Sequence, residues 1–307
     1  MSSGSTATPN ALPSDWTALG VTSGFEPEPL DHLRVLILGP PGQGKTTLVA
    51  SIPNSLMLDF EAGGHSIIGG NSHRKHIQDY DMYQTIIKQL ITDAKNNKRV
   101  FQTVVFDTGD SWSDLLIQQF LLEKSTPEKQ IESLDEYGSH GAGYGRIRSR
   151  ALNDLNSLYF HGYSWVITGH IGEKTITAAD GKTLTVLRPT MFPSLVKGLW
   201  GRADMVGTVE RAITTKREMV EKTLPGGKKV QIPGQLAKKK SYVLGLIGET
   251  LENSGGLSGG IDDKARLPGM VDEFELPSVD GWNKLADFYS SAAENARKLD
   301  GEMKKES

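Results

Sequence analysis

The chain has 307 residues, of which 37% are hydrophobic and 23% are charged, so it can bury a large core and is not disordered as a whole. It has no cysteine, which excludes disulfides and thiolate zinc sites, and its formal net charge of −3 gives no overall attraction to nucleic acid. No apolar run approaches the length of a membrane span, and the start lacks the features of a signal peptide. We therefore expect a cytoplasmic protein with no membrane partner.

The first strand is expected after a polar N-terminal segment. Residues 1–30 are rich in Ser, Thr, Pro and Gly and are predicted to form a flexible arm. Residues 33–38 form a short apolar run that ends at Gly39, which indicates a buried parallel strand. The helix that follows should end before Pro53, because proline disfavours helical backbone at the preceding residue.

Strand and helix patterns then alternate along the chain. Short apolar runs predict strands at residues 56–60, 103–107 and 165–168. Apolar residues at helical spacing predict helices around residues 82–94, 111–123, 147–159 and 193–200. Residues 174–188 alternate around Asp180-Gly181, which indicates a hairpin. Further strands, expected to be antiparallel, are predicted at residues 205–215, 228–232 and 242–247.

This order of elements predicts an α/β fold with a mostly parallel sheet that is extended by antiparallel hairpins. The predicted core covers residues 31–280. A C-terminal helix and charged tail are expected over residues 281–307.

A glycine-rich loop lies between the first predicted strand and the first predicted helix. In such a loop the backbone N–H groups approach phosphate oxygens closely, and a side chain at Gly42 or Gly44 would block them. Lys45 is expected to reach the β- and γ-phosphates, and the Thr46 hydroxyl to bind Mg²⁺ at the helix N-terminus. We therefore expect ATP and Mg²⁺ as ligands. The predicted nucleotide-binding residues are Gly39, Pro40, Pro41, Gly42, Gln43, Gly44, Lys45, Thr46 and Thr47.

Acidic residues follow two other predicted strands. Asp107 ends an apolar strand, as expected of the acid that holds Mg²⁺ through water, although it could instead cap a helix, for which Asp110 is the better candidate. Hydrolysis also needs a residue that activates water, and Glu61, Asp59 and Asp110 are the options. Glu61 is favoured because it lies just beyond a strand, at the edge where a parallel sheet binds ligands. It could also be a solvated turn acid.

His170 directly follows the fourth predicted strand. At the same edge it could donate a hydrogen bond to the γ-phosphate, although a lone histidine is more often structural.

Two clusters of basic residues contrast with the negative net charge. Between residues 216 and 240, eight Lys and Arg stand against two Glu, a local net charge of 8 − 2 = +6, and Arg146, Arg148 and Arg150 form a second cluster. Such clusters attract phosphates but are often only solvated faces, so both interpretations stay open.

The motifs taken together resemble the phage-encoded RecA-like ATPases, the Sak-type single-strand-annealing recombinases of the RecA/Rad51-like superfamily. The resemblance covers residues 33–276 and rests on GPPGQGKTT, LMLDFEAGG, TVVFDTGD, VITGHIGEK and DDKARLP in this order. It implies a RecA-like P-loop NTPase core that hydrolyses ATP, binds single-stranded DNA and promotes annealing or strand pairing. It also implies a homo-oligomer, a ring or filament, with nucleotide at subunit interfaces, in the host cytoplasm if the protein is phage-encoded.

The resemblance also implies roles for individual residues. The catalytic glutamate corresponds to Glu61, and the residue that couples nucleotide to DNA corresponds to His170, where RecA has Gln. Lys264 and Arg266 resemble residues that reach the γ-phosphate of a neighbouring subunit. The DNA loops correspond to residues 133–150 and 171–202.

Three other functions fit the same nucleotide site. They are a motor or helicase loader in phage replication or packaging, a small-molecule P-loop kinase, and a nucleotide-gated binding protein without turnover. An ATPase assay with and without single-stranded DNA separates the recombination ATPase from the kinase and the binding protein.

Overall fold

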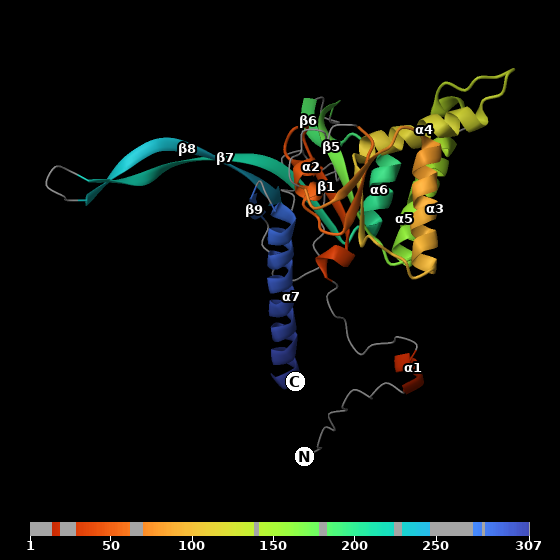
Figure 1. The fold of residues 1–307 in the computed structure, drawn as a ribbon. Coiled ribbons are helices and arrows are strands. Elements are labelled where there is room, and N and C mark those ends of the chain that lie inside the picture. Colours follow the sequence, from red (N-terminus) through yellow and green to blue (C-terminus); the bar gives the residue numbers. More distant parts are fainter. Residues whose placement is uncertain are drawn as a thin grey trace, which may run out of the picture.

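The computed structural model describes residues 14–18, 29–61, 70–137, 141–177, 183–223, 229–245, 273–277 and 280–306. Within these residues the chain forms a nine-stranded mixed sheet with helices on both faces (Figure 1). The strand order is β3-β2-β4-β5-β1-β7-β8-β9, and β6 pairs with β5. The predicted α/β fold with a mostly parallel sheet is therefore confirmed.

The parallel strands of the sheet bring their carboxyl ends together at one edge. They are β1 (Arg34–Gly39), β2 (Ser55–Asp59), β3 (His73–His76), β4 (Thr103–Asp107), the first part of β5 (Ser164–Thr177) and the start of β7 (Met205–Thr223). In the register, Gly39 lies opposite His170, and Asp59 lies opposite Asp107. The carboxyl ends of these strands therefore meet at one edge, where α/β sheets bind ligands.

The antiparallel part of the sheet is longer than predicted. β6 (Thr183–Pro189) pairs with β5 as the expected hairpin, and β9 (Glu273–Pro277) pairs with β8 (Lys229–Gly245). β8 is one strand where two were predicted, because Pro233 and Gly234 interrupt the strand pattern in the sequence. The structure accommodates them at a register shift opposite Arg217 and Met219, and such irregularities are where strands tolerate proline.

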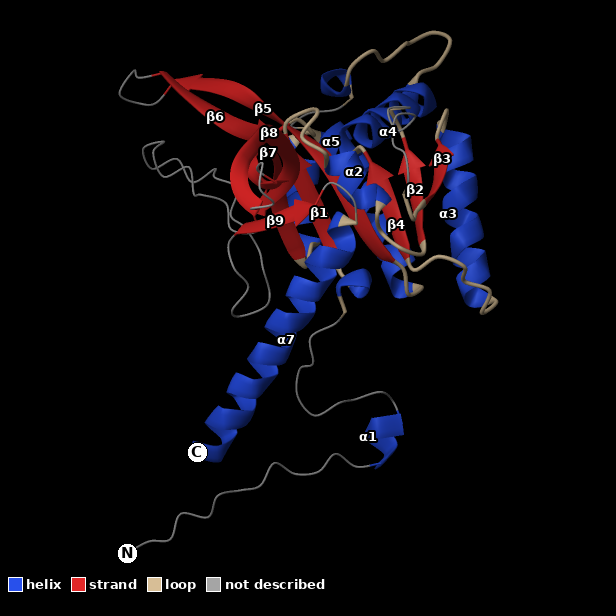
Figure 2. Cartoon of the chain, turned by 60° about the vertical axis from the view of Figure 1, so that its left-hand side comes forward, coloured by secondary structure: helices blue, strands red, loops and turns tan. Residues whose placement is uncertain are grey.

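The helices cover the two faces of the sheet (Figure 2). They are α2 (Lys45–Ala50), α3 (Tyr80–Lys95), α4 (Gly109–Lys124), α5 (Ala142–Phe160), α6 (Pro193–Arg202) and α7 (Gly281–Glu306). Short helical turns also occur at α1 (Ser14–Ala18), within the predicted arm, and at η1 (Leu30–His32) and η3 (Leu134–Glu136). No helix in the described ranges is both long and apolar enough to cross a membrane.

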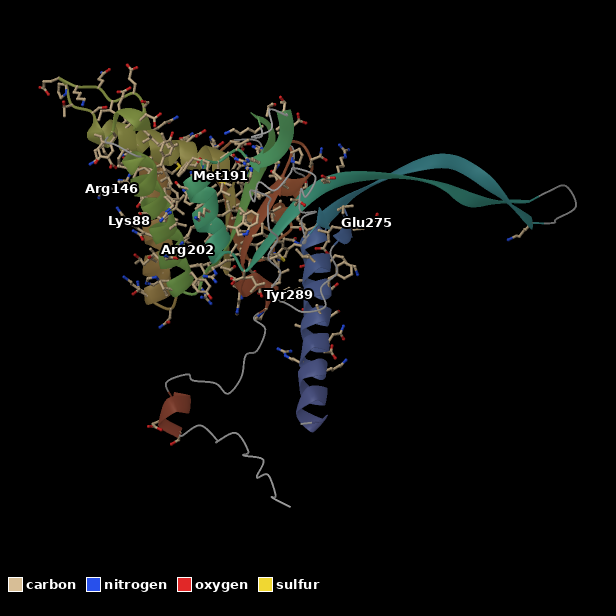
Figure 3. All side chains as sticks on the ribbon, turned by 180° about the vertical axis from the view of Figure 1, so that it is seen from behind. Lys88, Arg146, Met191, Arg202, Glu275 and Tyr289 are labelled. Carbon is tan, nitrogen blue, oxygen red and sulfur yellow. The ribbon has the colours of Figure 1, made fainter. Side chains whose placement is uncertain are left out.

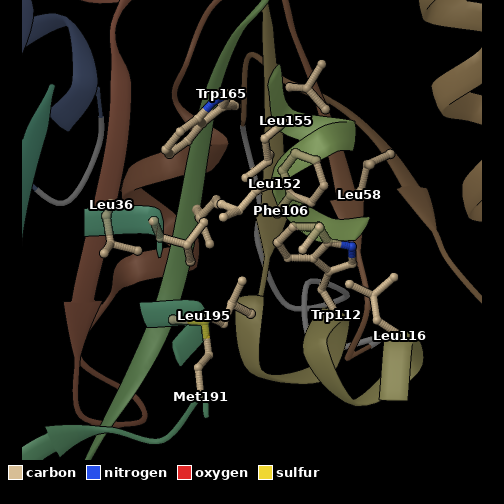
Figure 4. Close-up of a cluster of buried hydrophobic side chains, with 14 of the residues drawn as sticks. Leu36, Leu58, Phe106, Trp112, Leu116, Leu152, Leu155, Trp165, Met191 and Leu195 are labelled. Atoms are coloured by element: carbon tan, nitrogen blue, oxygen red, sulfur yellow. The ribbon is translucent and has the colours of Figure 1, made fainter. Parts of the chain in front are cut away.

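Alternating strand residues divide the core into two layers, because successive side chains of a strand point to opposite faces. Leu36 and Phe106 pack with α3, α4, α5 and α6, and Figure 4 shows Phe106 beside Trp112 in this layer. Val35 and Val105 pack on the other face with α2 and the first half of α7, which contributes Trp282, Leu285, Tyr289, Ala292 and Ala293.

One local prediction was wrong and one strand was missed. Thr108 is the residue before α4, which begins at Gly109, so neither Asp107 nor Asp110 caps this helix. The helix predicted around residues 147–159 is α5, and its buried residues include Ala151, Leu155 and Leu158. β3 was missed because His73–His76 carries no apolar residue, and charged residues are common on edge strands.

Asp204 joins the loop after α6 to the start of β1. Its carboxylate accepts hydrogen bonds from the Arg34 backbone N–H at 3.0 Å and from the Arg34 guanidinium at 2.7 and 2.8 Å. We expect Asp204→Ala to lower the free energy of unfolding by about 2–4 kcal/mol, because it leaves a partly buried guanidinium without its partner. Urea denaturation of this variant beside Asp287→Ala, an exposed site on α7, checks the prediction; equal midpoints would contradict it.

Candidate nucleotide site

The P-loop connects the carboxyl end of β1 to the N-terminus of α2. Gly42 and Gly44 have left-handed backbone angles, with φ of 74° and 94°, which residues with a side chain rarely adopt. A Cβ atom at Gly39 would clash with the backbone carbonyl of Val209 on β7, whereas the space beside Gly42 is open. The glycines therefore shape a cradle in which backbone N–H groups can approach an anion.

Lys45 lies inside this loop as the first residue of α2. Its ammonium donates hydrogen bonds to the carbonyl oxygens of Gly39 at 2.8 Å and Pro40 at 2.9 Å. Burial lowers the pKa of Lys45, and the nearby carboxylates of Asp107, Asp110 and Glu61 partly oppose this shift. The cation is thus held at the loop, next to three carboxylates at the same sheet edge.

Thr46 and Asp107 form a pair of oxygen ligands beside the P-loop. The Thr46 hydroxyl donates to Asp107 Oδ1 at 3.2 Å, and Thr168 Oγ1 donates to the same oxygen at 2.5 Å. Oxygen atoms are the ligands that Mg²⁺ prefers, and Mg²⁺ usually completes its shell with phosphates and water. The described residues include no cluster of three or more His, Cys, Asp or Glu that could hold a metal unaided. The pair therefore fits Mg²⁺ that is bound together with a nucleotide.

The pKa of Asp107 determines how Mg²⁺ binding by the Thr46–Asp107 pair depends on pH. Burial raises the pKa of Asp107, hydrogen bonds from Thr168 and Thr46 oppose this, and the charges of Asp59 and Glu61 raise it further. Because Mg²⁺ needs the ionised carboxylate, we expect Mg²⁺-dependent nucleotide binding to weaken on acidification at a higher pH than an ordinary aspartate would allow.

Calorimetric titration of nucleotide with and without Mg²⁺ across pH checks this. The Mg²⁺-free titration controls for protonation of the phosphates. Asp107→Asn should lose most of the Mg²⁺ effect at every pH, and a variant that keeps the full pH-dependent Mg²⁺ effect would contradict the assignment.

Glu61 and Asp110 lie just beyond the ends of β2 and β4, and they come together with His170, which lies within β5 at the last residue paired with β1. Glu61 Oε1 accepts hydrogen bonds from Thr108 Oγ1 at 2.5 Å and Ser111 Oγ at 3.1 Å. His170 Nδ1 lies 3.9 Å from Glu61 Oε1 and 3.6 Å from Asp110 Oδ2. The structure therefore brings three predicted site residues together beside the Thr46–Asp107 pair.

The three candidate acids have different surroundings. The Asp59 carboxylate binds Arg74 and the Glu61 backbone N–H, and Asp59 is buried. Asp110 accepts from the His170 backbone N–H at 2.7 Å and from the Thr190 hydroxyl, so both of its oxygens hold the base of the β5–β6 hairpin. The Glu61 side chain is 36% exposed, against 15% for Asp110. Glu61 is thus the most exposed of the three acids.

Several residues of this site were not predicted. Thr108, Ser111, Thr168 and Thr190 donate to the site carboxylates. Of these, only Thr168 carried a usable signal, because it ends a predicted strand two residues before His170. Lys264 and Arg266 lie outside the described residues.

The sheet is mostly parallel and has a P-loop after its first strand. Thr46 and Asp107 supply two oxygen atoms that fit Mg²⁺, and Glu61 lies at the same edge of the sheet. These features define a P-loop nucleotide-binding protein of the ATPase type. A family model described as an AAA domain matches residues 31–239, which is more than half of the chain, and the protein belongs to this family. No curated protein matches the chain. The predicted P-loop NTPase class is confirmed at this level.

Proposed function

We propose that the protein hydrolyses ATP with Mg²⁺ and that single-stranded DNA stimulates this turnover, in a phage recombination protein that promotes annealing or strand pairing. The observation that carries the proposal is the position of Glu61, which is oriented by Thr108 and Ser111 next to the Thr46–Asp107 pair. A kinase needs no residue that activates water, whereas a hydrolase does.

The residues divide the work of hydrolysis as follows. Lys45 and the N-terminus of α2 stabilise negative charge on the phosphates, and Thr46 and Asp107 hold Mg²⁺, which neutralises further phosphate charge when bound. Glu61 Oε2 accepts a hydrogen bond from the attacking water and takes its proton. His170 lies close enough to Glu61 to report a change there to the β5–β6 hairpin.

Coupling to DNA is supported by the contacts of Asp110. This residue lies in the first turn of α4, next to the nucleotide edge, and holds both His170 and Thr190 at the base of the β5–β6 hairpin. The hairpin falls within residues 171–202, which correspond to a DNA loop in the resemblance to RecA-like ATPases. A DNA strand bound at the hairpin can therefore act on the nucleotide site through Asp110.

The experiment is a measurement of phosphate release with Mg²⁺, with and without single-stranded DNA. Stimulated release supports the proposal. Stimulation by duplex alone or by a protein partner would instead favour the motor or loader, phosphate transfer to a small molecule the kinase, and nucleotide binding without turnover the binding protein.

A variant of Asp110 tests the coupling separately from the chemistry. We expect Asp110→Ala to keep basal hydrolysis within a few-fold of the wild type and to lose most of the stimulation by single-stranded DNA, because alanine has no oxygen that can accept the hydrogen bonds of the hairpin. Phosphate release over a range of DNA concentrations checks this. Unchanged stimulation would contradict the role of Asp110.

Assembly with nucleotide between subunits remains a proposal that rests on the resemblance and on the sequence around Lys264 and Arg266. A cation supplied by a neighbour would stabilise charge on the γ-phosphate. Mixing Arg266→Ala subunits with Lys45→Ala subunits tests this proposal. In the mixture, one type of subunit interface would contain both an intact Lys45 and an intact Arg266. A mixture with no gain in activity would count against a residue supplied in trans.

A further inference from the structure

β7 and β8 continue as a two-stranded ribbon beyond the rest of the sheet. β1 pairs with β7 only as far as Thr208, and β9 pairs with β8 only from Ser241 to Gly245. From Ile213–Lys240 to Thr223–Lys229, the two strands pair with each other and with no other described strand. Figure 1 shows the ribbon extending away from the body of the protein. We call residues 212–223 and 229–240 the ribbon.

The ribbon has a charge opposite to that of the rest of the chain. It contains seven Lys and Arg against two Glu, a net charge of 7 − 2 = +5, while the whole chain has −3, so the remainder has −3 − 5 = −8. Residues paired across two strands share a face, and neighbours along a strand alternate. The Lys238 and Lys240 positions therefore lie on one face and the Lys239 position on the other. Basic positions on both faces suit a polyanion that surrounds the ribbon.

The composition of the ribbon distinguishes between two kinds of nucleic acid. Surfaces that bind single strands combine basic groups with aromatic side chains on which bases stack. Residues 212–240 include no Phe, Tyr or Trp. A two-stranded ribbon, by contrast, fits the major groove of a duplex, which is about 12 Å wide and bordered by phosphates.

We propose that the ribbon is a duplex-DNA-binding arm that contacts phosphates without reading the base sequence. This goes beyond the proposed ATPase, and it separates strand pairing from simple annealing, because only strand pairing acts on a duplex as well as on a single strand.

The base of the arm lies against the nucleotide site. Gln43 of the P-loop accepts a hydrogen bond from the Arg211 backbone N–H at 2.8 Å, one residue before the ribbon begins. The backbone of Val209 lies against Gly39, so closely that a Cβ atom there would clash. A duplex that binds the arm therefore binds an extension of β7, which is the β-strand that borders the P-loop.

The first test neutralises the basic triplet near the base of the arm. Lys238→Gln, Lys239→Gln and Lys240→Gln are combined, and the matched control combines Lys88→Gln, Lys95→Gln and Lys98→Gln, three exposed residues on or just after α3. Both variants lose the same charge. Figure 3 shows Lys88 on the far side of the molecule from Glu275, which marks the base of the arm.

Fluorescence anisotropy is measured without nucleotide, with a random-sequence duplex and a single strand of equal length, at several salt concentrations. The salt dependence of log K should become shallower by about 0.9 for each phosphate that the protein no longer neutralises, so by up to roughly 2.7 for the ribbon variant. Duplex affinity at low salt should fall at least about tenfold, and the α3 control should match the wild type.

The second test removes the arm. Residues 214–239 are replaced by Asn-Gly, a two-residue turn that joins Ile213 to Lys240, which are directly paired, and leaves the β1–β7 and β8–β9 pairs intact. Loss of duplex binding with single-strand binding retained supports the proposal. Duplex binding equal to that of the wild type in either variant, or an equal loss for duplex and single strand, overturns it. If the shortened chain does not fold, as judged by circular dichroism, the triple substitution decides.

The anisotropy measurement contains no ATP. A result that overturns the duplex-binding arm therefore leaves the proposed ATP hydrolysis unaffected.

Discussion

Replacing Lys45 with alanine is expected to lower the rate of ATP hydrolysis by at least about 10²-fold, because the substitution removes a cation that stabilises charge on the transferring phosphate. Lys45 is buried and its ammonium binds only the Gly39 and Pro40 carbonyls among described residues, so it is already at the loop before nucleotide binds. Phosphate release at saturating ATP measures the effect.

Two controls separate chemistry from folding in this experiment. Lys45→Met keeps the aliphatic stem and loses only the charge, so it should be as inactive as the alanine variant while retaining more of the packing. Lys88→Ala removes an exposed lysine on α3 and should leave turnover unchanged. Wild-type turnover in both Lys45 variants would refute ATP hydrolysis at this P-loop.

Glu61→Gln is expected to lower kcat by about 10²- to 10⁴-fold while nucleotide affinity stays within a few-fold of the wild type. Glutamine has the same size, and its amide oxygen can still accept from Thr108 and Ser111, but it cannot take a proton from water. Single-turnover hydrolysis and nucleotide titration together measure the two effects.

Asp110→Asn is the matched variant for this comparison, since it changes a carboxylate 3.6 Å from the same histidine. Its oxygens hold the hairpin base, so basal turnover should persist. If Asp110→Asn loses hydrolysis and Glu61→Gln keeps it, the assignment of the water-activating residue to Glu61 is wrong.

The P-loop and the strand-end residues could be predicted because their signals are contiguous in the sequence. GPPGQGKTT contains the glycines, the lysine and the threonine of the site within nine residues, between an apolar strand and a helix. Asp107 and His170 each follow an apolar run, and parallel pairing then brings both to the edge where Gly39 lies. Local patterns therefore sufficed for the fold class and for most of the site.

The division of roles among the acids depended on contacts between distant parts of the chain. Asp59, Glu61 and Asp110 offer the same carboxylate chemistry as isolated residues. Only the fold shows that Arg74 donates to Asp59. It also shows that His170 and Thr190 donate to Asp110. Sequence patterns report which face of an element is apolar. They carry no information on which polar groups from other elements will satisfy a given carboxylate.

The sequence alone determined the nucleotide site and the basic composition of residues 216–240, because charge and a contiguous motif need no fold to be read. Tertiary structure decided that seven of those eight basic residues lie on a two-stranded ribbon that begins next to the P-loop. The reason is that strand pairing joins residues far apart in the chain, 240 − 213 = 27 positions for Ile213 and Lys240, and pairing at that separation depends on backbone hydrogen bonds that no local pattern specifies.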